Sequence, residues 1–353
     1  MTLTIPCGGA RPPERRRRQL LQLLGLAPWL WPMLTGAAER RLALAFGALP
    51  PAGSVQRVLA AGYPAAVLLY CLAPQKLLGW PVPLPQGARE LLAPAQSDLP
   101  LLGRLAGRGS TMTLEQLVLL APDLVIDAGS VTATYRSMAE RVAQQTGIPY
   151  LLVDGRLEES AQQLREVGRL LGVAERAEQL ARYAEQTFAL AARLRAGGRT
   201  RPRVYLARAA DGLETGLGGA IHAEAVELAG GYNVASGLGR GGLARVSLEQ
   251  VLDWNPDFIL THNQNFYAAA RRSPLWRQLP AVREGRLYLV PHLPFGWLDS
   301  PPGINRLLGV RWLLALFHAD AGIDVLATAR AFFQLFYSSS PSEETLRGLI
   351  EPA

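Results

Sequence analysis

Cysteine is scarce in this sequence. The 353 residues contain two, Cys7 near the N-terminus and Cys71 in an apolar run. Cys7 falls in a segment interpreted below as a cleaved leader, so an intramolecular disulfide is excluded from the mature chain. Histidine is almost as rare, with four residues, and their spacing matches no local zinc motif.

Catalytic motifs are missing as well. The sequence has no Gly-x-Ser-x-Gly nucleophile elbow, no Walker A loop and no dinucleotide fingerprint after its first predicted strand. Once a leader has been removed, the remaining Cys71 is predicted to be a buried small apolar residue and not a nucleophile. These absences argue against an enzyme, although a two-lobed α/β enzyme stays the alternative from another functional class.

Positive charge is concentrated at the N-terminus. The formal net charge is +7, from 36 basic and 29 acidic residues, and Lys76 is the single lysine. Within the first 38 residues, five arginines stand against Glu14, so the remainder of the chain carries only +3. A nucleic-acid binder usually shows a basic face together with a recognisable motif. The sequence shows neither, and we exclude nucleic acid as a partner.

Residues 1–38 predict an export signal. Arg15–Arg18 precede the apolar stretch Leu20–Leu34, and small residues follow, which is the layout of a twin-arginine (Tat) signal peptide. Two prolines interrupt the stretch, which is shorter than the ~20 residues that span a bilayer. We therefore expect cleavage near Ala37 or Ala38 and a periplasmic mature chain, with an uncleaved membrane anchor as the alternative. The sequence leaves open whether Leu42–Phe46 is ordered.

Short apolar runs alternate with helical patterns along the mature chain. The first series predicts strands at Val55–Ala60, Leu77–Trp80, Leu124–Asp127 and Tyr150–Val153, and helices at Tyr63–Leu72, Leu114–Leu120 and Ser137–Thr146. The second predicts strands at Val204–Ala207, Phe258–Thr261 and Leu287–Val290, and helices at His222–Leu228, Leu248–Leu252, Asn305–Leu316 and Val325–Leu335. Such alternation is typical of parallel βαβ units.

Two helical stretches separate the series. Leu157–Leu171 predicts a helix that ends at Gly172, and Ala174–Leu194 predicts a longer one of about 32 Å at 1.5 Å per residue. A helix of that length braces two lobes instead of acting as a flexible hinge. We therefore expect an α/β lobe over residues 54–172, a connecting helix over 173–197 and a second α/β lobe over 201–353.

Two segments carry a resemblance to a known family. Leu114–Ile126 reads LEQLVLLAPDLVI, and Val246–Ile259 reads VSLEQVLDWNPDFI. In both, a glutamate opens a short helix and a Pro-Asp turn leads into a buried strand. Together with two α/β lobes on one long helix, these segments resemble the class III periplasmic binding proteins of ABC importers. The likeness runs roughly from Val55 to the C-terminus, and is greatest to receptors for iron complexes and other metal chelates.

The resemblance implies a fold, a function and partners. The fold is α/β, with two Rossmann-like lobes joined by a single long α-helix. The function is capture of an iron–siderophore or related metal chelate and its delivery to the permease of an ABC importer, whose ATPase subunits act through the permease. The implied docking residues are Glu115 and Glu249, although the helix dipole alone also favours a carboxylate in the first turn. We expect a monomer with no intrinsic cofactor.

Ligands of such proteins bind where the carboxyl ends of parallel strands face the cleft between the lobes. The candidate ligand-binding residues at those ends are Tyr63, Trp80, Arg104, Arg108, Tyr135, Arg208, His262, Tyr267 and Trp297. Arginine and tyrosine suit a carboxylate, a catecholate or a metal, and a tryptophan offers a flat face to a chelate or macrocycle. The structural alternatives are a simple turn for Gly103–Gly109 and core packing for Trp297.

His222 and His292 are candidates for direct metal contact, because imidazole is the commonest transition-metal ligand. The alternative for both is an ordinary hydrogen-bonded role in a loop. A free ion of iron, nickel or cobalt, a haem or a corrinoid is therefore the alternative cargo. A free ion needs three or four convergent imidazole and carboxylate ligands, and the scarcity of histidine favours an organic or anionic chelate.

Overall fold

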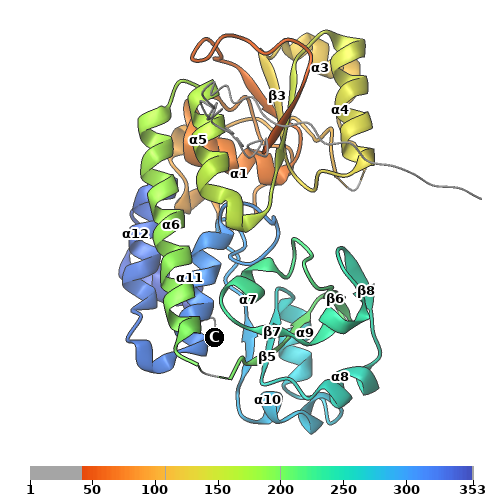
Figure 1. The fold of residues 1–353 in the computed structure, drawn as a ribbon, viewed down its shortest axis with the longest axis vertical. Coiled ribbons are helices and arrows are strands. Elements are labelled where there is room, and N and C mark those ends of the chain that lie inside the picture. The colour runs from red at the N-terminus through yellow and green to blue at the C-terminus, as the bar shows by residue number, and fades with distance from the viewer. Residues whose placement is uncertain (1–41, 108, 199, 352–353) are drawn as a thin grey trace, which may run out of the picture. The chain divides into compact units, whose positions relative to one another are not determined.

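The chain builds two four-stranded sheets, one at the centre of each of two α/β lobes (Figure 1). The computed structural model describes residues 42–107, 109–198 and 200–351. The predicted leader and Arg108 lie outside these ranges. No helix in the described ranges is both long and apolar enough to cross a membrane.

The sheet of the first lobe is parallel except at one edge. Its order is β1 (Ala43–Phe46), β4 (Tyr150–Asp154), β3 (Leu124–Gly129) and β2 (Val58–Ala60). The strands β2, β3 and β4 are parallel, and β1 adds an antiparallel edge in which Ala43 pairs with Val153. The segment whose order the sequence left open is thus an edge strand.

Helices cover both faces of this first sheet. They are α1 (Tyr63–Leu72), α2 (Pro94–Ser97), α3 (Leu114–Leu120), α4 (Ala133–Thr146) and α5 (Ser160–Leu170), with short 3₁₀ turns at Pro74–Lys76, Arg89–Leu91 and Leu157–Glu159. Because successive strand residues point to opposite faces, Val58 and Ala60 pack in one core with α1 and α5, whereas Leu59 packs in another with α3 and α4. A parallel sheet buried on both faces follows.

The second lobe has a fully parallel sheet. Its order is β10 (Leu287–Leu289), β9 (Phe258–Thr261), β5 (Arg203–Ala207) and β7 (Tyr232–Asn233), and a separate antiparallel ribbon pairs β6 (Glu214–Gly216) with β8 (Leu243–Arg245). The helices are α7 (Glu224–Leu228), α8 (Leu248–Trp254), α9 (Gln264–Ala270) and α10 (Pro280–Arg283), with 3₁₀ turns at Val234–Leu238 and Trp276–Gln278.

The longest helix, α6 (Ala174–Ala196), connects the two lobes. It has 23 residues, which corresponds to about 35 Å, and packs against α5 and α11 (Arg306–Phe317). A first-turn Glu175 and last-turn Arg193 and Arg195 complement the helix dipole. Figure 1 shows α6 beside α11 and α12 (Val325–Tyr337); a 3₁₀ turn at Ala319–Ala321 and α13 (Glu343–Ile350) complete the chain.

An aromatic junction, made of Tyr70, Trp80, Phe295 and Tyr337, ties the C-terminal part of the chain to the first lobe. The Phe295 ring lies 6.0 Å from Tyr70, 5.9 Å from Trp80 and 5.4 Å from Tyr337 between centroids. The Tyr70 hydroxyl donates a hydrogen bond of 2.8 Å to the Tyr337 carbonyl. Aromatic pairs at such distances stabilise beyond their buried area, so the core runs continuously across the lobes.

Helices α3 and α8 are built in the same way. At the start of α3, the Thr113 hydroxyl accepts the N–H of Gln116 at 3.2 Å, and at the start of α8, Ser247 accepts that of Gln250 at 3.2 Å. These N-caps satisfy amide groups that a helix leaves without intrahelical partners. The same capping chemistry thus fixes the first turn of both helices, where the two predicted docking glutamates stand.

The aspartate after each of these helices ties it to the neighbouring strand. Asp123 Oδ2 accepts the backbone N–H of Arg57 at 2.9 Å, and Asp257 Oδ2 accepts that of Arg203 at 2.7 Å. Both arginines then donate from Nη2, at 2.7 Å, to the carbonyl of the last residue of α3 and α8 respectively. The two Pro-Asp motifs therefore hold equivalent helices against equivalent strands.

The predicted alternation of strands and helices is confirmed, with two local corrections. The strand predicted at Leu77–Trp80 is wrong: only isolated bridges form there, because Gly79 packs tightly on its neighbours and Pro81 has no N–H to continue a ladder. The helix predicted from His222 begins at Glu224 instead. His222 lies in the turn that precedes this helix, and its ring contacts a buried carboxylate, described below.

Candidate functional site

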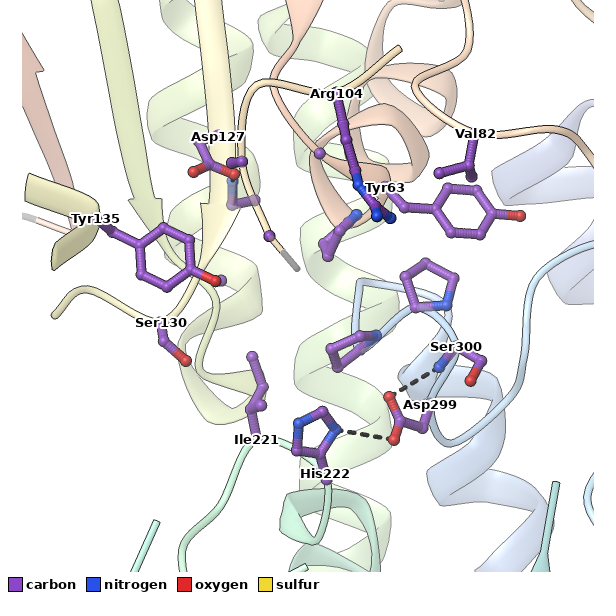
Figure 2. Close-up of a pocket in the computed structure, with 18 of the residues that line it drawn as sticks. Tyr63, Val82, Arg104, Asp127, Ser130, Tyr135, Ile221, His222, Asp299 and Ser300 are labelled. Carbon is purple, nitrogen blue, oxygen red and sulfur yellow. Dashed lines mark hydrogen bonds and ion pairs between the residues drawn. The ribbon is translucent and has the colours of Figure 1, made fainter. Parts of the chain in front are cut away.

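A cavity of about 460 Å³ lies between the two lobes. Its first-lobe wall follows β2 and β3, and its second-lobe wall follows β5 and includes the loop after β10. It is therefore placed at the carboxyl ends of parallel strands, where α/β proteins bind ligands. Figure 2 shows Arg104 and Tyr135 reaching into it from the first lobe, with His222 and Asp299 opposite.

Arg104 is presented by a glycine-rich loop. Gly103, Gly107 and Gly109 have φ angles of +88°, +97° and +81°, a region that side chains with a Cβ seldom adopt. The Arg104 Nε donates to the Gly109 carbonyl at 2.6 Å, and its backbone N–H donates to the Thr111 hydroxyl at 3.0 Å. The loop thus folds back on its own arginine and aims the guanidinium at the cavity.

An ionic cluster of Arg208, His222 and Asp299 forms the second-lobe wall. Asp299 is 2% exposed and pairs with the Arg208 guanidinium, and its Oδ2 lies 2.8 Å from His222 Nδ1. The Ser300 N–H donates to Asp299 Oδ1 at 2.8 Å, and Arg208 Nε lies 3.5 Å from a Glu214 carboxylate oxygen. Burying a carboxylate without such partners would be costly. The cluster therefore holds Arg208 and His222 in fixed positions at the cavity.

Asp127, at the end of β3, is a second buried carboxylate on the cavity wall. Burial raises its pKa to about 6, although hydrogen bonds from the Tyr150 hydroxyl (3.2 Å) and the Ala128 N–H (2.9 Å) oppose the rise. Burial, and then the charge of Asp127, raise the pKa of the Tyr135 phenol. Tyr135 therefore meets the cavity as a neutral hydroxyl that can donate a hydrogen bond.

We expect Asp127→Asn to stabilise the protein at alkaline pH. The folded-state pKa of about 6 exceeds the ~3.9 of an exposed aspartate, so the folded state binds this proton more tightly than the unfolded state. Stability therefore falls as pH rises between these two values, and above pH 6 the loss reaches on the order of 3 kcal/mol. Urea denaturation at pH 5 and pH 8 measures the effect. Asparagine keeps an acceptor for the Tyr150 hydroxyl and carries no charge.

The control for this prediction is the exposed Asp253 on α8. Asp253→Asn should leave the pH dependence of the unfolding free energy unchanged. If Asp127→Asn also follows the parent protein from pH 5 to pH 8, the buried carboxyl of Asp127 is not the source of the dependence.

Five of the residues predicted from the sequence line the cavity together. They are Tyr63, Arg104, Tyr135, Arg208 and His222. They come from both lobes, as binding between lobes requires. Burial raises the pKa of Tyr63, and its hydroxyl has no hydrogen-bond partner among the described residues.

Both predicted tryptophans lie in the core and not on the cavity wall. Trp80 is 2% exposed, belongs to the aromatic junction and donates its indole N–H to the Gln96 carbonyl at 2.8 Å. Trp297 is fully buried, and its indole N–H has no partner among the described residues. Core packing, the alternative stated for Trp297, is where the structure places both side chains.

The remaining second-lobe candidates also stand apart from the cavity lining. His262 follows β9 and is half-buried; burial, and then the positive charge of Arg208, lower its pKa to about 3. The Arg271 guanidinium lies over the ring of Tyr267 on α9, 5.1 Å from the centroid of that ring. His292 is exposed. Within the described part of the chain, no group of three or more His, Cys, Asp or Glu side chains is placed to hold a metal ion.

Sequence reasoning missed the carboxylates. Asp127 and Asp299 line the cavity, yet neither is among the candidate ligand-binding residues, because an anionic ligand is expected to contact arginine and tyrosine and not a carboxylate. The signal was present for Asp127, which ends the run Leu124–Asp127 at a strand's carboxyl end. Asp299 lies in an irregular loop, and its pairing with Arg208, 91 residues away, has no local sequence signature.

The glutamates at positions 115 and 249 are fully exposed in the first turns of α3 and α8. Bonding to its own backbone N–H, and then to the Thr113 hydroxyl, lowers the pKa of Glu115; the same interactions, with Ser247, lower that of Glu249. Both carboxylates are thus held ionised at the N-terminus of a helix, whose dipole also favours negative charge.

The chain matches the family model described as periplasmic binding protein over residues 93–293, and it belongs to that family. The fold expected from the sequence, two α/β lobes on one long helix, is confirmed. Family membership also confirms a binding protein in place of an enzyme, and implies a periplasmic location. The Tat leader lies outside the described residues and stays a prediction.

Individual relatives agree with the family. A solved ABC transporter solute binding protein from Sulfurospirillum deleyianum is similar with a TM-score of 0.78 and 27% identity, covering 85% of this chain and 95% of that one. The molybdate-binding protein MolA of Haemophilus influenzae is 29% identical over 119 residues, which spans 33% of each protein and thus a third of that relative's length. The structure of MolA bound to molybdate has a TM-score of 0.66 at 22% identity, over 84% of this chain and 96% of that one.

Proposed function

We propose that this protein captures an anionic metal chelate, such as an iron–siderophore, in the cavity between its lobes and delivers it to the permease of an ABC importer. The observation that carries the proposal is the meeting of Arg104 from the first lobe with Arg208 and His222 from the second at one cavity of about 460 Å³. Guanidinium groups pair bidentately with carboxylate and catecholate oxygens. A solute held from both sides draws the lobes together.

The charge of the cavity favours a chelate of modest negative charge. Asp299 offsets much of the positive charge of Arg208, and Asp127 is mostly ionised at neutral pH because its pKa is about 6. A highly charged anion would be repelled by these carboxylates. The volume also lies within the ~300–1,000 Å³ that is usual for small-molecule sites, and a chelate fills more of it than a single ion does.

A tetrahedral oxyanion such as molybdate is the second candidate. The match to a protein named for molybdate binding favours it. Two arginines, a tyrosine hydroxyl and a histidine suffice to bind a small oxyanion by charge-assisted hydrogen bonds. Such a ligand would leave much of the cavity to water, in contrast with a chelate.

Delivery requires contact with the membrane components of the importer. The ionised, exposed Glu115 and Glu249 lie in equivalent positions on the two lobes, and we propose that each pairs with a cationic group of the permease. Both glutamates reach their partners on the permease at the same time only when a bound solute holds the two lobes at the right spacing. The protein acts as a monomer that carries the solute without chemical change.

The test is a binding panel on protein purified from the periplasm. Isothermal titration and native mass spectrometry would use ferric nitrilotriacetate, sodium molybdate, haemin and nickel chloride. We expect the ferric complex to bind as one molecule per chain and to be displaced by related ferric carboxylate chelates of similar charge. Binding of molybdate alone would replace the chelate by the oxyanion, and a bare ion or haem alone would overturn both candidates.

A further inference from the structure

An ion pair between the buried Arg306 and the partly buried Glu224 lies where the two lobes meet, close to the cavity. Arg306 begins α11 and is 1% exposed, and its Nη1 lies 2.8 Å from Oε2 of Glu224, the first residue of α7. Buried ion pairs contribute little net stability on average, because desolvating both charges costs about as much as their attraction returns. The burial of this pair therefore points to a role in geometry.

Every guanidinium nitrogen of Arg306 donates a hydrogen bond, and the acceptors come from both lobes. Nη2 donates at 2.6 Å to the carbonyl of Gly155, which follows β4 in the first lobe. Nη1 donates at 2.7 Å to the carbonyl of Ile221, which precedes α7 in the second lobe. Nε donates at 3.0 Å to the Gly303 carbonyl. One rigid planar group thus spans the two lobes.

Glu224 makes a further bond across the lobes. Its Oε2, which accepts from Arg306, also accepts the backbone N–H of Leu157 in the first lobe at 3.1 Å. The pair therefore joins the lobes both through the Gly155 carbonyl and through the Leu157 amide. Neither bond involves a side chain of the first lobe, so what the pair fixes is the position of its backbone.

The backbone groups held in this way adjoin the cavity walls. Gly155 donates its N–H to the Gly129 carbonyl at 2.8 Å, and the two glycines pack so closely that a Cβ on Gly155 would lie 2.7 Å from the Gly129 Cα. Gly129 and Ser130 line the cavity on the first lobe, and Ile221 and His222 line it on the second. In Figure 2, Ser130 is drawn to the left of Ile221, and His222 lies below both.

We propose that Glu224 and Arg306 are positioning residues that set the spacing between Gly129–Ser130 and Ile221–His222, and thereby the size of solute that the cavity accepts. A guanidinium suits this role because its N–H donors are fixed in one plane. A lysine ammonium keeps the charge but cannot reach all of the acceptors at once. The inference rests on the proposed function only in requiring that the cavity binds a solute.

The first test measures lobe spacing without any ligand. Spin labels would be placed on Glu140→Cys in α4 and Arg272→Cys after α9, both exposed positions. Cys71, the native cysteine in the described ranges, is buried and will not react with the spin-label reagent. Double electron–electron resonance should give one narrow distance distribution in the parent. We expect Arg306→Lys to broaden it at least twofold, and an unchanged distribution would overturn the proposal.

The second test measures solute selectivity, which a loss of stability alone does not change. Glu224→Leu combined with Arg306→Met leaves no unpaired buried charge, but it removes the partners of the Gly155, Ile221 and Gly303 carbonyls and of the Leu157 N–H. It should therefore lower the thermal midpoint as well as broaden the distance distribution. The ratio of affinities for molybdate and for ferric nitrilotriacetate should change at least tenfold in this variant and in Arg306→Lys. The control replaces the exposed pair Arg330–Glu343, 3.1 Å apart, in the same way and should change neither quantity.

Failure of the proposed function is distinguishable from failure of this inference. If the parent binds neither probe, the proposed cargo is wrong, and the ligand-free distance distributions still decide the role of the pair. If the probes bind and both variants keep the parent's distances and affinity ratio, the positioning role is overturned and the proposed cargo stands. If the double variant does not fold, Arg306→Lys alone decides by the same two measurements.

Discussion

Replacing both Glu115 and Glu249 by alanine is expected to lower solute uptake by more than tenfold while leaving solute affinity unchanged. Truncating one partner of a charge pair that is desolvated at an interface costs about 2 kcal/mol or more, and each 1.4 kcal/mol is about a factor of ten in affinity. Both glutamates are exposed on helix first turns away from the cavity lining, so the solute is not in contact with them. Uptake into proteoliposomes that contain the permease and ATPase measures the loss.

Single substitutions sharpen the test, because each lobe carries one glutamate in an equivalent setting. Each single variant should retain partial uptake, with the double variant the most impaired. The matched control is Glu344→Ala, which removes an exposed glutamate from the first turn of α13 and should be silent. Full uptake by the double variant, with normal solute binding, would sink the docking role and reduce both residues to ordinary helix-terminal charges.

The parts of the fold that follow local rules could be predicted from the sequence. Each of the two Pro-Asp motifs is a short contiguous pattern, in which a glutamate opens a short helix and a Pro-Asp turn leads into a buried strand, and such a pattern is visible in the sequence itself. The connecting helix was found because residues 174–194 contain no helix breaker, and the structure extends it by only two residues, to Ala196. Where a short stretch carries its own capping and periodicity, sequence reasoning succeeds.

The candidate site could be predicted only in part, because tertiary contacts decide which side chains reach the cavity. Trp80 ends a predicted strand and Trp297 lies in the loop after β10, but in the structure Trp80 packs against Tyr70 and Phe295 in the aromatic junction. Phe295 lies more than 200 residues from Trp80 in sequence, and the periodicity of the sequence does not indicate such a distant contact. The same holds for Asp299, whose partners Arg208 and His222 come from a different part of the lobe.

The second large effect concerns the two arginines of the cavity, which should respond differently to substitution. Arg104→Ala is expected to weaken binding of the solute identified in the panel by ten- to a hundredfold, because a charge-assisted hydrogen bond contributes about 1.5–3 kcal/mol. Stability should change little, since Arg104 is carried by a glycine-rich loop and its Nε bonds locally to the Gly109 carbonyl. Arg104→Lys should recover part of the affinity if charge matters, and little if the bidentate geometry matters.

Arg208 differs because it already has a buried partner. Removing its guanidinium leaves Asp299, which is 2% exposed, with His222 as its main partner, and an uncompensated buried charge costs several kcal/mol. Arg208→Ala should therefore lower the thermal midpoint as well as the solute affinity. The double variant Arg208→Met with Asp299→Leu should recover the thermal midpoint but not the solute affinity. Calorimetry and titration on the same samples separate the two effects. The control is Arg136→Ala on α4, which removes an exposed arginine and should change neither the thermal midpoint nor the solute affinity. Unchanged solute affinity in Arg104→Ala would contradict the assignment of the cavity as the binding site.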